Sequence, residues 1–285
     1  MYGEQILVDT LSQAAITDKN GDRWQYHPRS DRHSKASCWG MLFDLMLSCA
    51  VLRDHVADGK VAFGINHEIV DFKQNRKKNL DLVICTPRGS AAKTKARTLV
   101  DLVAHYGIVL SIDAQKRLAT LPAMHEAPVG DVLVALEAKA CMTAHIKAQP
   151  RLYDELNSSH LTVHGSSSEA LAAGLVVINY SETFASPGRA GYCPRCGHRV
   201  APVNPHKQPN DGDGVRDKVM QLPRRTKADE DGFDALAIVA IDCTNDGSSV
   251  ALMPSPPAPS ASDIFNYDQC VSRLASRFAT RFPKL

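Results

Sequence analysis

Two apolar segments carry the residues best suited to chemistry. Residues 130–140 read GDVLVALEAKA, and residues 79–84 read NLDLVI. Side chains alternate between the two faces of a β-strand, so Glu137 and Lys139 point to the same side. If the strand that carries Asp81 pairs alongside, Asp81 and Glu137 can bind Mg²⁺ through carboxylate oxygens, while Lys139 steadies a water molecule or phosphate charge. This arrangement favours hydrolysis of a phosphodiester bond.

Asp81 on one strand, followed by Glu-Ala-Lys at 137–139, resembles the motif of the PD-(D/E)XK nuclease superfamily, the fold of many restriction endonucleases and repair nucleases. The sequence QPRLY at 149–153 is similar to the Gln-x-x-x-Tyr motif of the RecB-like exonuclease branch. The resemblance covers about residues 35–180. Two departures stand out: Asn79-Leu80 replaces the proline that often precedes the aspartate, and a long insertion follows Asp81.

The resemblance implies a catalytic set made of Asp81, Glu137, Lys139, Gln149 and Tyr153. In that set Gln149 and Tyr153 contact the substrate phosphate or brace the metal site. The alternative is that these two residues cap and pack an ordinary helix. For Asp81, Glu137 and Lys139 the alternative is an ion pair at the edge of a sheet.

Other acids compete for roles at this site. Asp71 and Asp131 are rival choices for the first carboxylate, but Asp131 would lie about 20 Å from Glu137 along an extended strand and could not share its metal. Asp44 is a candidate accessory ligand within an apolar helix, or else a buried acid satisfied by a neighbouring donor. Glu68 could serve in its place, or be an exposed carboxylate at a strand end.

The elements that must position these residues alternate between helix and strand. We expect a helix at 37–53 with Ser34 or Ser37 as N-cap, strands at 60–70, 79–85, 132–140 and 174–180, and a short helix at 149–157 with Pro150 in its first turn. An insertion at 91–121 has helical periodicity, and strands at 233–243 and 249–253 precede a final helix at 264–282. The resemblance implies the same order in its core. The predicted class is α/β, a restriction-endonuclease-like core with a mixed central sheet flanked by helices.

The composition fits one soluble globular domain. The chain has 285 residues, of which 44% are hydrophobic and 22% charged. We expect a single elaborated nuclease domain over 1–285, with a core at about 35–180, a cysteine-containing loop insertion at about 186–227, and strands and a helix at about 228–285. Residues 1–24 lack the basic start and apolar core of a secretory signal, so the expected compartment is the cytoplasm, without a membrane. Neither a Gly-x-Ser-x-Gly elbow nor a Walker phosphate loop occurs in the sequence.

The insertion contains the one close cysteine pair, Cys193 and Cys196, followed by His198. The spacing resembles half of a zinc ribbon or knuckle, and His206 could be the fourth ligand of a closed structural Zn²⁺ site. A plain turn with free thiols is the alternative.

The formal net charge is only +2, but the residues between 73 and 97, beside Asp81, are mostly basic among their charged members. Lys73, Arg76, Lys77 and Lys78 are the ones among them that we expect to contact DNA phosphates, which would make binding sensitive to salt. A solvated polar face is the alternative.

Together these features predict a Mg²⁺-dependent DNA endonuclease that acts in restriction or in defence against foreign DNA. The alternatives are a RecB-like exonuclease of repair or recombination, and a catalytically silent nucleic-acid-binding protein. Besides DNA, the expected partners are a second copy of the chain or a larger defence or repair complex.

Overall fold

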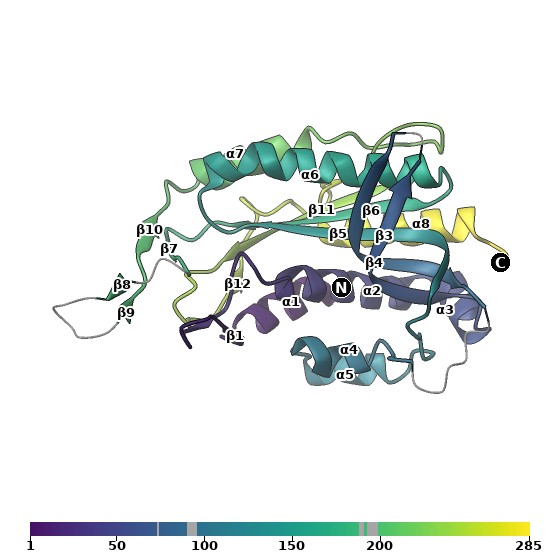
Figure 1. Cartoon of the computed structure of the whole chain (residues 1–285), viewed down its shortest axis with the longest axis horizontal. Coiled ribbons are helices and arrows are strands. Elements are labelled where there is room, and N and C mark those ends of the chain that lie inside the picture. The colour runs from purple at the N-terminus through teal and green to yellow at the C-terminus, as the bar shows by residue number, and fades with distance from the viewer. Residues whose placement is uncertain (73, 90–95, 188–190, 193–198) are drawn as a thin grey trace.

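A six-stranded mixed sheet forms the centre of the molecule (Figure 1). The computed structural model describes residues 1–72, 74–89, 96–187, 191–192 and 199–285. In spatial order, the strands of the sheet are β12 (Ala251–Leu252), β11 (Ala235–Asp242), β6 (Leu171–Asn179), β5 (Val129–Cys141), β4 (Arg76–Pro87) and β3 (Ala62–Asp71). The predicted α/β class, with a mixed central sheet flanked by helices, is confirmed.

The connections between strands set their directions. A short turn joins β3 to β4, and β4 also runs antiparallel to β5. A helical crossover carries the chain from β5 to β6, so these two strands are parallel, as are β6 and β11. Strand β12 is antiparallel to β11. Every residue of β6 is buried, as expected for a strand covered on both faces.

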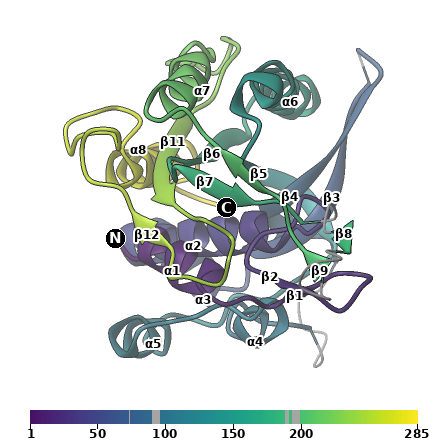
Figure 2. The same cartoon turned by 90° about the vertical axis from the view of Figure 1, so that its left-hand side faces the viewer.

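Helices cover both faces of the sheet. The hydrophobic core on one face includes residues of α1 (Gly3–Leu11), α2 (Arg32–Ser48), α3 (Ala50–Ala57) and α8 (Tyr267–Arg281). The core on the other face includes residues of α6 (His145–Ser166) and α7 (Asn210–Met220). Figure 1 shows α6 and α7 above the sheet and α1 to α3 below it. The β3–β4 hairpin leaves the sheet and projects beyond the rest of the molecule (Figure 2).

Two predicted helices differ from the structure at their bounds. The helix expected at 37–53 begins earlier, at Arg32, and breaks at Cys49, whose backbone is extended. The helix expected at 149–157 begins at His145 and has 22 residues, so Pro150 lies inside it and not in its first turn. Pro150 is on the exposed side.

The described part of the chain contains no single helix with the length and apolar composition needed to cross a membrane. Helices α2 and α3 meet that test only when they are taken together, across a bend of 97°.

The segment at 186–227, predicted as a loop insertion, contains a helix, α7, and that prediction was wrong over residues 210–220. Val215 and Val219 on α7 are buried, and this contact with the core stabilises a helix that its two glycines and three aspartates would not form alone. The short strands around it are β7 (Thr183–Ala185), β8 (Gly191–Tyr192), β9 (Arg199–Val200) and β10 (Val203–Pro205). Two further hairpin strands, β1 (Ile16–Thr17) and β2 (Arg23–Trp24), and two short helices, α4 (Asp101–Tyr106) and α5 (Ile112–Leu118), complete the described elements.

Asp44 ties α1, α2 and α8 together. Its fully buried carboxylate accepts hydrogen bonds from the N–H of Tyr2 at 2.9 Å, the N–H of Gly3 at 2.7 Å and the hydroxyl of Tyr267 at 2.9 Å. The Asp44 carboxylate thus accepts from the two N–H groups at the start of α1, whose N-cap residue makes no side-chain cap of its own. Asp44 is therefore a structural residue, which was one of the two alternatives for it.

A second buried carboxylate, Asp234, holds the C-terminal part of the chain to the sheet. Arg225 donates to both of its oxygens at 3.0 Å, and Arg277 on α8 donates to Oδ1 at 2.7 Å. The N–H of Ala172 in β6 donates to Oδ2 at 2.8 Å. Both Asp234 and Arg225 are almost completely buried, so each requires the other.

Candidate active site

Strands β4 and β5 separate at the position of Asp81. Their pairing runs from Pro87 and Val129 to Leu82 and Leu136 and stops there. At the next position the N–H of Ala138 donates to Asp81 Oδ2 at 3.1 Å. An aspartate side chain therefore takes the place of a main-chain acceptor, and the N–H that it binds is that of the residue after Glu137.

The other oxygen of Asp81 is held by α2. Oδ1 accepts hydrogen bonds from Ser34 Oγ at 2.9 Å and from Lys35 Nζ at 3.2 Å. Lys35 is almost fully buried and also donates to the carbonyl oxygen of Asp81 at 3.1 Å. Helix α2 thus fixes Asp81 from the side of the sheet opposite α6.

The strand alternation predicted for Glu137 and Lys139 is confirmed. Lys139 Nζ lies 2.8 Å from Glu137 Oε1, and Lys78 Nζ lies 3.9 Å from the same oxygen. Glu137 is only 3% exposed. Its Oε2 has no hydrogen-bond donor among the described residues. A buried carboxylate oxygen without a donor is costly, and a cation would satisfy it.

Glu137, Lys139 and Lys78 change one another's pKa values. Burial, reinforced by the charge of Asp81, raises the pKa of Glu137, while Lys139 and Lys78 oppose that shift. Burial on its own would lower the pKa of Lys139, but Glu137, Asp81 and Glu155 together outweigh burial, and the pKa of Lys139 is raised. Lys139 is therefore an ammonium ion at neutral pH. Burial lowers the pKa of Lys78, against the opposing effect of Glu137.

Helix α6 adds Glu155 to the group, which sequence reasoning missed. Glu155 Oε2 lies 3.8 Å from Lys139 Nζ, and the carbonyl oxygen of Glu155 accepts a hydrogen bond from Lys78 at 2.9 Å. Arg151 donates to Glu155 Oε1 at 2.6 Å, one helical turn away. The spacing of Arg151 and Glu155 marks them as neighbours on a helix, but no sequence pattern indicates that they face β5.

His33, in the first turn of α2, was also missed. Burial lowers its pKa to about 4, with Asp81 opposing and Lys139 adding to that effect, so the imidazole is neutral. Its ring centroid lies 5.1 Å from that of Tyr26. The predicted helix began after His33 and Lys35. Because of this error in the helix start, neither residue was predicted to lie at the site.

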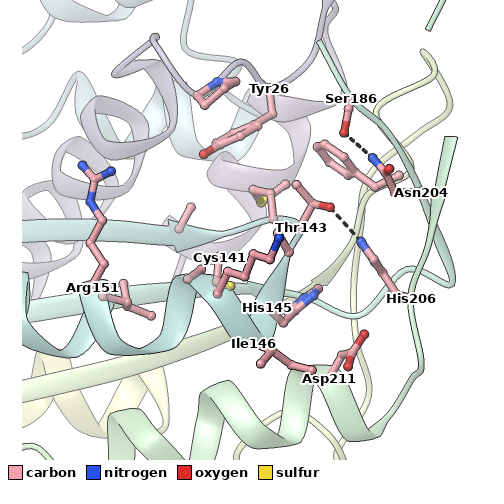
Figure 3. A pocket seen from close by; sticks show the side chains of 18 of the residues that line it. Tyr26, Cys141, Thr143, His145, Ile146, Arg151, Ser186, Asn204, His206 and Asp211 are labelled. Carbon is pink, nitrogen blue, oxygen red and sulfur yellow. Dashed lines mark hydrogen bonds between the residues drawn. The ribbon is translucent and has the colours of Figure 1, made fainter. Parts of the chain in front are cut away.

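A cavity of about 760 Å³ opens beside Lys139. The first turn of α6, the end of β5 and the segments around Tyr26, Phe184 and His206 line it. Figure 3 shows Tyr26 on one side of this space, His145 and Ile146 on another and Arg151 at one end. The cavity and the carboxylates thus share Lys139 and Glu155 as a common wall.

Gln149 and Tyr153 lie on the side of α6 that faces α7. The ammonium of Lys218 on α7 lies 4.4 Å from the centroid of the Tyr153 ring. A Cβ atom at Gly214 would come within 2.7 Å of Gln149 Nε2. Neither residue lines the cavity. The structure therefore does not bring them to Asp81 and Glu137, and the packing alternative accounts for their position.

The basic residues predicted to contact DNA divide into two groups. Arg76 and Lys77 are exposed on the projecting hairpin, where Lys77 lies 3.4 Å from Glu68. Lys78, in contrast, lies 3.9 Å from Glu137 and donates to the carbonyl oxygen of Glu155. Lys73 lies outside the described residues. Glu68 is thus an exposed partner of Lys77 and not a ligand beside Asp81.

Neither rival aspartate lies where β4 and β5 separate. Asp71 ends β3, near the tip of the hairpin, and accepts a hydrogen bond from the N–H of Gln74 at 3.2 Å. Asp131 is exposed near the start of β5, where its N–H donates to Thr86 Oγ1 at 2.8 Å.

Three of the predicted zinc ligands, Cys193, Cys196 and His198, lie outside the described residues. His206 is described, and both of its ring nitrogens have partners. Nδ1 donates to the carbonyl oxygen of Ser181 at 2.9 Å, and Nε2 lies 3.0 Å from Thr143 Oγ1. Since a carbonyl can only accept, Nδ1 is the donor in its bond to Ser181.

Within the described ranges, no three His, Cys, Asp or Glu side chains are grouped so that they could hold a metal ion by themselves. Asp81 and Glu137 offer two carboxylates, and Mg²⁺ is commonly held by one or two protein carboxylates together with water and substrate phosphate. The two carboxylates are therefore a donor set that suits Mg²⁺ only if other ligands come from outside the protein.

No protein-family model, curated protein or solved structure matches this chain at a significant level.

Proposed function

We propose that this protein is a Mg²⁺-dependent DNA endonuclease with an active site of the PD-(D/E)XK type. One observation carries the proposal: where β4 and β5 separate, Asp81 is held beside Glu137, and Lys139 contacts Glu137 at 2.8 Å. Two carboxylates with one ammonium ion suit the hydrolysis of a phosphodiester bond better than any other chemistry considered for the chain.

The order of the elements around the site supports the same proposal. Helix α2 precedes the antiparallel strands β3, β4 and β5, and α6 then crosses to β6, which is parallel to β5. This is the helix, strand, strand, strand, helix, strand order that the nuclease resemblance implies. We therefore assign the central part of the chain to a restriction-endonuclease-like core.

In the proposed mechanism Asp81 and Glu137 would hold the metal ion, and Lys139 would face the substrate. Mg²⁺ bound there would polarise the phosphate and lower the pKa of a coordinated water molecule. Glu137 Oε2 is the oxygen free to bind it, since no described residue donates to that atom. Lys139, as an ammonium ion, would donate hydrogen bonds to the attacking water or to a phosphate oxygen and offset the charge that develops there.

The projecting hairpin supplies the surface for binding DNA. Arg76 and Lys77 are exposed, and Lys78 follows them into the active site on the same strand. A phosphate backbone that contacts the hairpin would thus lead directly to Glu137. We place this activity in restriction or in defence against foreign DNA, with the protein acting as a homodimer or within a larger complex.

Cleavage of a supercoiled plasmid tests the proposal. We expect purified protein with Mg²⁺ to convert closed circles to nicked or linear DNA, and EDTA to stop the reaction. Cleavage of linear DNA alone would instead indicate a RecB-like exonuclease, because a closed circle has no end. Binding of both substrates without cleavage of either, with Mg²⁺ or Mn²⁺, would indicate a silent nucleic-acid-binding protein and overturn the proposal.

A further inference from the structure

The cavity beside Lys139 has the size of a binding site for one small ligand. Its volume of about 760 Å³ falls within the range of roughly 300–1,000 Å³ that is usual for pockets that enclose a ligand. It is not the metal site, because Asp81 and Glu137 do not line it. It shares Lys139 and Glu155 with the group around Glu137, however. A ligand in the cavity would thus lie next to a phosphate bound at Asp81 and Glu137.

One side of the cavity offers flat rings. Tyr26 and His33 lie on this side and are partly exposed, and His206 lines the cavity beside His145. The Tyr26 ring lies 5.1 Å from His33 and 6.2 Å from Phe184, and the Phe184 ring is stacked with His206 at 6.3 Å. No described residue forms a hydrogen bond with the Tyr26 hydroxyl, and burial raises its pKa to about 12, so it remains a neutral donor. Partly exposed aromatic rings of this kind bind flat, uncharged groups by stacking.

The charged side chains that line the cavity are three cations and the two carboxylates of Glu155 and Asp211, so the lining is positive by one charge. Helix α6 begins on the opposite side of the cavity with no side-chain cap at Ala144, so the positive end of its dipole faces the cavity. The exposed side chains of Lys147 and Arg151 follow within two turns, and Lys139 stands at the boundary with the carboxylates. This side is suited to a sugar-phosphate backbone. A stacking surface facing a phosphate-binding surface matches the two ends of a nucleotide.

We propose that the cavity receives one unpaired nucleotide of the substrate strand, next to the phosphate that is cleaved. The base stacks on Tyr26, and its phosphate lies toward Lys139 and Arg151. This inference rests on the proposed nuclease function and deepens it by naming the substrate class. A paired base cannot enter the cavity unless it is extruded from the duplex at a cost of a few kcal/mol, so DNA with an unpaired nucleotide is the preferred substrate.

Binding without cleavage tests the inference separately from catalysis. The probe is a duplex with a single bulged 2-aminopurine nucleotide, mixed with the protein in EDTA, and the control is the fully paired duplex. We expect quenching of the 2-aminopurine fluorescence as the base stacks on Tyr26, and tighter binding of the bulged duplex. Tyr26→Ala should remove the quenching and weaken bulge binding by about 5- to 150-fold, the range for a base stacked on an aromatic ring. Tyr26→Phe keeps the ring and should behave like the wild type.

A second variant covers the case in which Tyr26→Ala fails to fold. Arg151 is largely exposed at the end of the cavity, so Arg151→Met should fold normally and weaken binding of the bulged duplex more than binding of the paired one. Equal quenching and affinity in the wild type, Tyr26→Ala and Arg151→Met would overturn the inference while leaving plasmid cleavage, and with it the proposed function, intact. Failure of the proposed function would appear as absence of plasmid cleavage with Mg²⁺.

Discussion

The N–H of Ala138 donates to the carboxylate of Asp81 at 3.1 Å, where the main-chain pairing of β4 and β5 has ended. This bond fixes the carboxylate without any help from a metal ion. Ser34 and Lys35 fix its other oxygen in the same way. The site is therefore largely preorganised, and substitutions in it should change chemistry more than they change the fold.

Asp81→Ala, Glu137→Ala and Lys139→Ala should each lower the rate of plasmid cleavage by at least about 100-fold, because each removes a charged group from the reacting phosphate. Initial rates with saturating Mg²⁺ measure the effect, and circular dichroism checks the fold. The matched control is Asp131→Asn, on the same strand but exposed and away from the site. Wild-type rates in any two of the three alanine variants would contradict the assignment.

Arg76 and Lys77 should contribute to DNA affinity, while Lys78 contributes mainly to the active site. The double variant Arg76→Gln/Lys77→Gln should flatten the slope of log Kd against log salt by about 2, since two fewer counterions are released. Fluorescence anisotropy over a salt series measures this slope. As a control, Lys116→Gln/Arg117→Gln changes an equally exposed pair on α5, on the opposite side of the molecule (Figure 2). An unchanged slope in the hairpin variant would show that the hairpin does not contact DNA.

Glu137 should titrate above the ordinary glutamate pKa of about 4.3 in metal-free protein, because burial disfavours its charge. Lys78→Met should raise this pKa further, since the Lys78 ammonium stabilises the ionised form. Carbon-13 NMR of labelled glutamate carboxyl groups measures the midpoint. Lys77→Met, one residue away but directed to Glu68, is the control and should leave the midpoint unchanged. A downward shift in Lys78→Met would refute the electrostatic description of the site.

Asp234→Ala should lower the free energy of unfolding by about 3–5 kcal/mol, because it leaves the buried guanidinium of Arg225 without its partner. Urea denaturation measures the change. Arg281→Met removes a more exposed contact to Glu169 at 3.8 Å and should cost no more than about 1 kcal/mol. Equal losses of unfolding free energy in the two variants would show that burial of Asp234 and its partners does not make their interaction more stabilising.

The zinc hypothesis concerns residues beyond the described ranges. If the loop forms a single tetrahedral site, protein purified without added metal should contain about one equivalent of zinc. Cys193→Ser/Cys196→Ser should lose it. His206→Gln should retain it, because both ring nitrogens of His206 already have hydrogen-bond partners. Elemental analysis decides between the outcomes. Loss of zinc in His206→Gln would restore this residue as a ligand, and no zinc in well-folded wild-type protein would leave a plain turn with free thiols.

Some of the site could be predicted from the sequence because strand geometry has a period of two. The shared face of Glu137 and Lys139 follows from their spacing alone, and the apolar runs located β3, β4, β5 and β6. The position of Asp81 beside β5 required only that the two strands pair. These relationships are local or depend on a single pairing.

The remaining contacts depend on how distant elements meet. Lys35, His33 and Glu155 reach the site because α2 and α6 pack on opposite faces of the sheet, and no spacing in the sequence encodes that approach. The helical face of Gln149 and Tyr153 could be predicted, but not that α7 would cover it. Helix α7 was not predicted because its glycines and aspartates have low helix propensity. Tertiary packing overrides that propensity in the folded chain.

The cap that Asp44 provides for α1 also constrains the order in which the chain can fold. The Tyr267 hydroxyl that donates to Asp44 belongs to a residue 223 positions later in the chain. Helices α1 and α2 are therefore synthesised long before this third donor to Asp44. Contacts of such large sequence separation form slowly, because a long stretch of chain must be ordered first. Docking of α8 is therefore a late step in folding, and in a nascent chain that stops short of α8 the Asp44 carboxylate lacks one of its three donors.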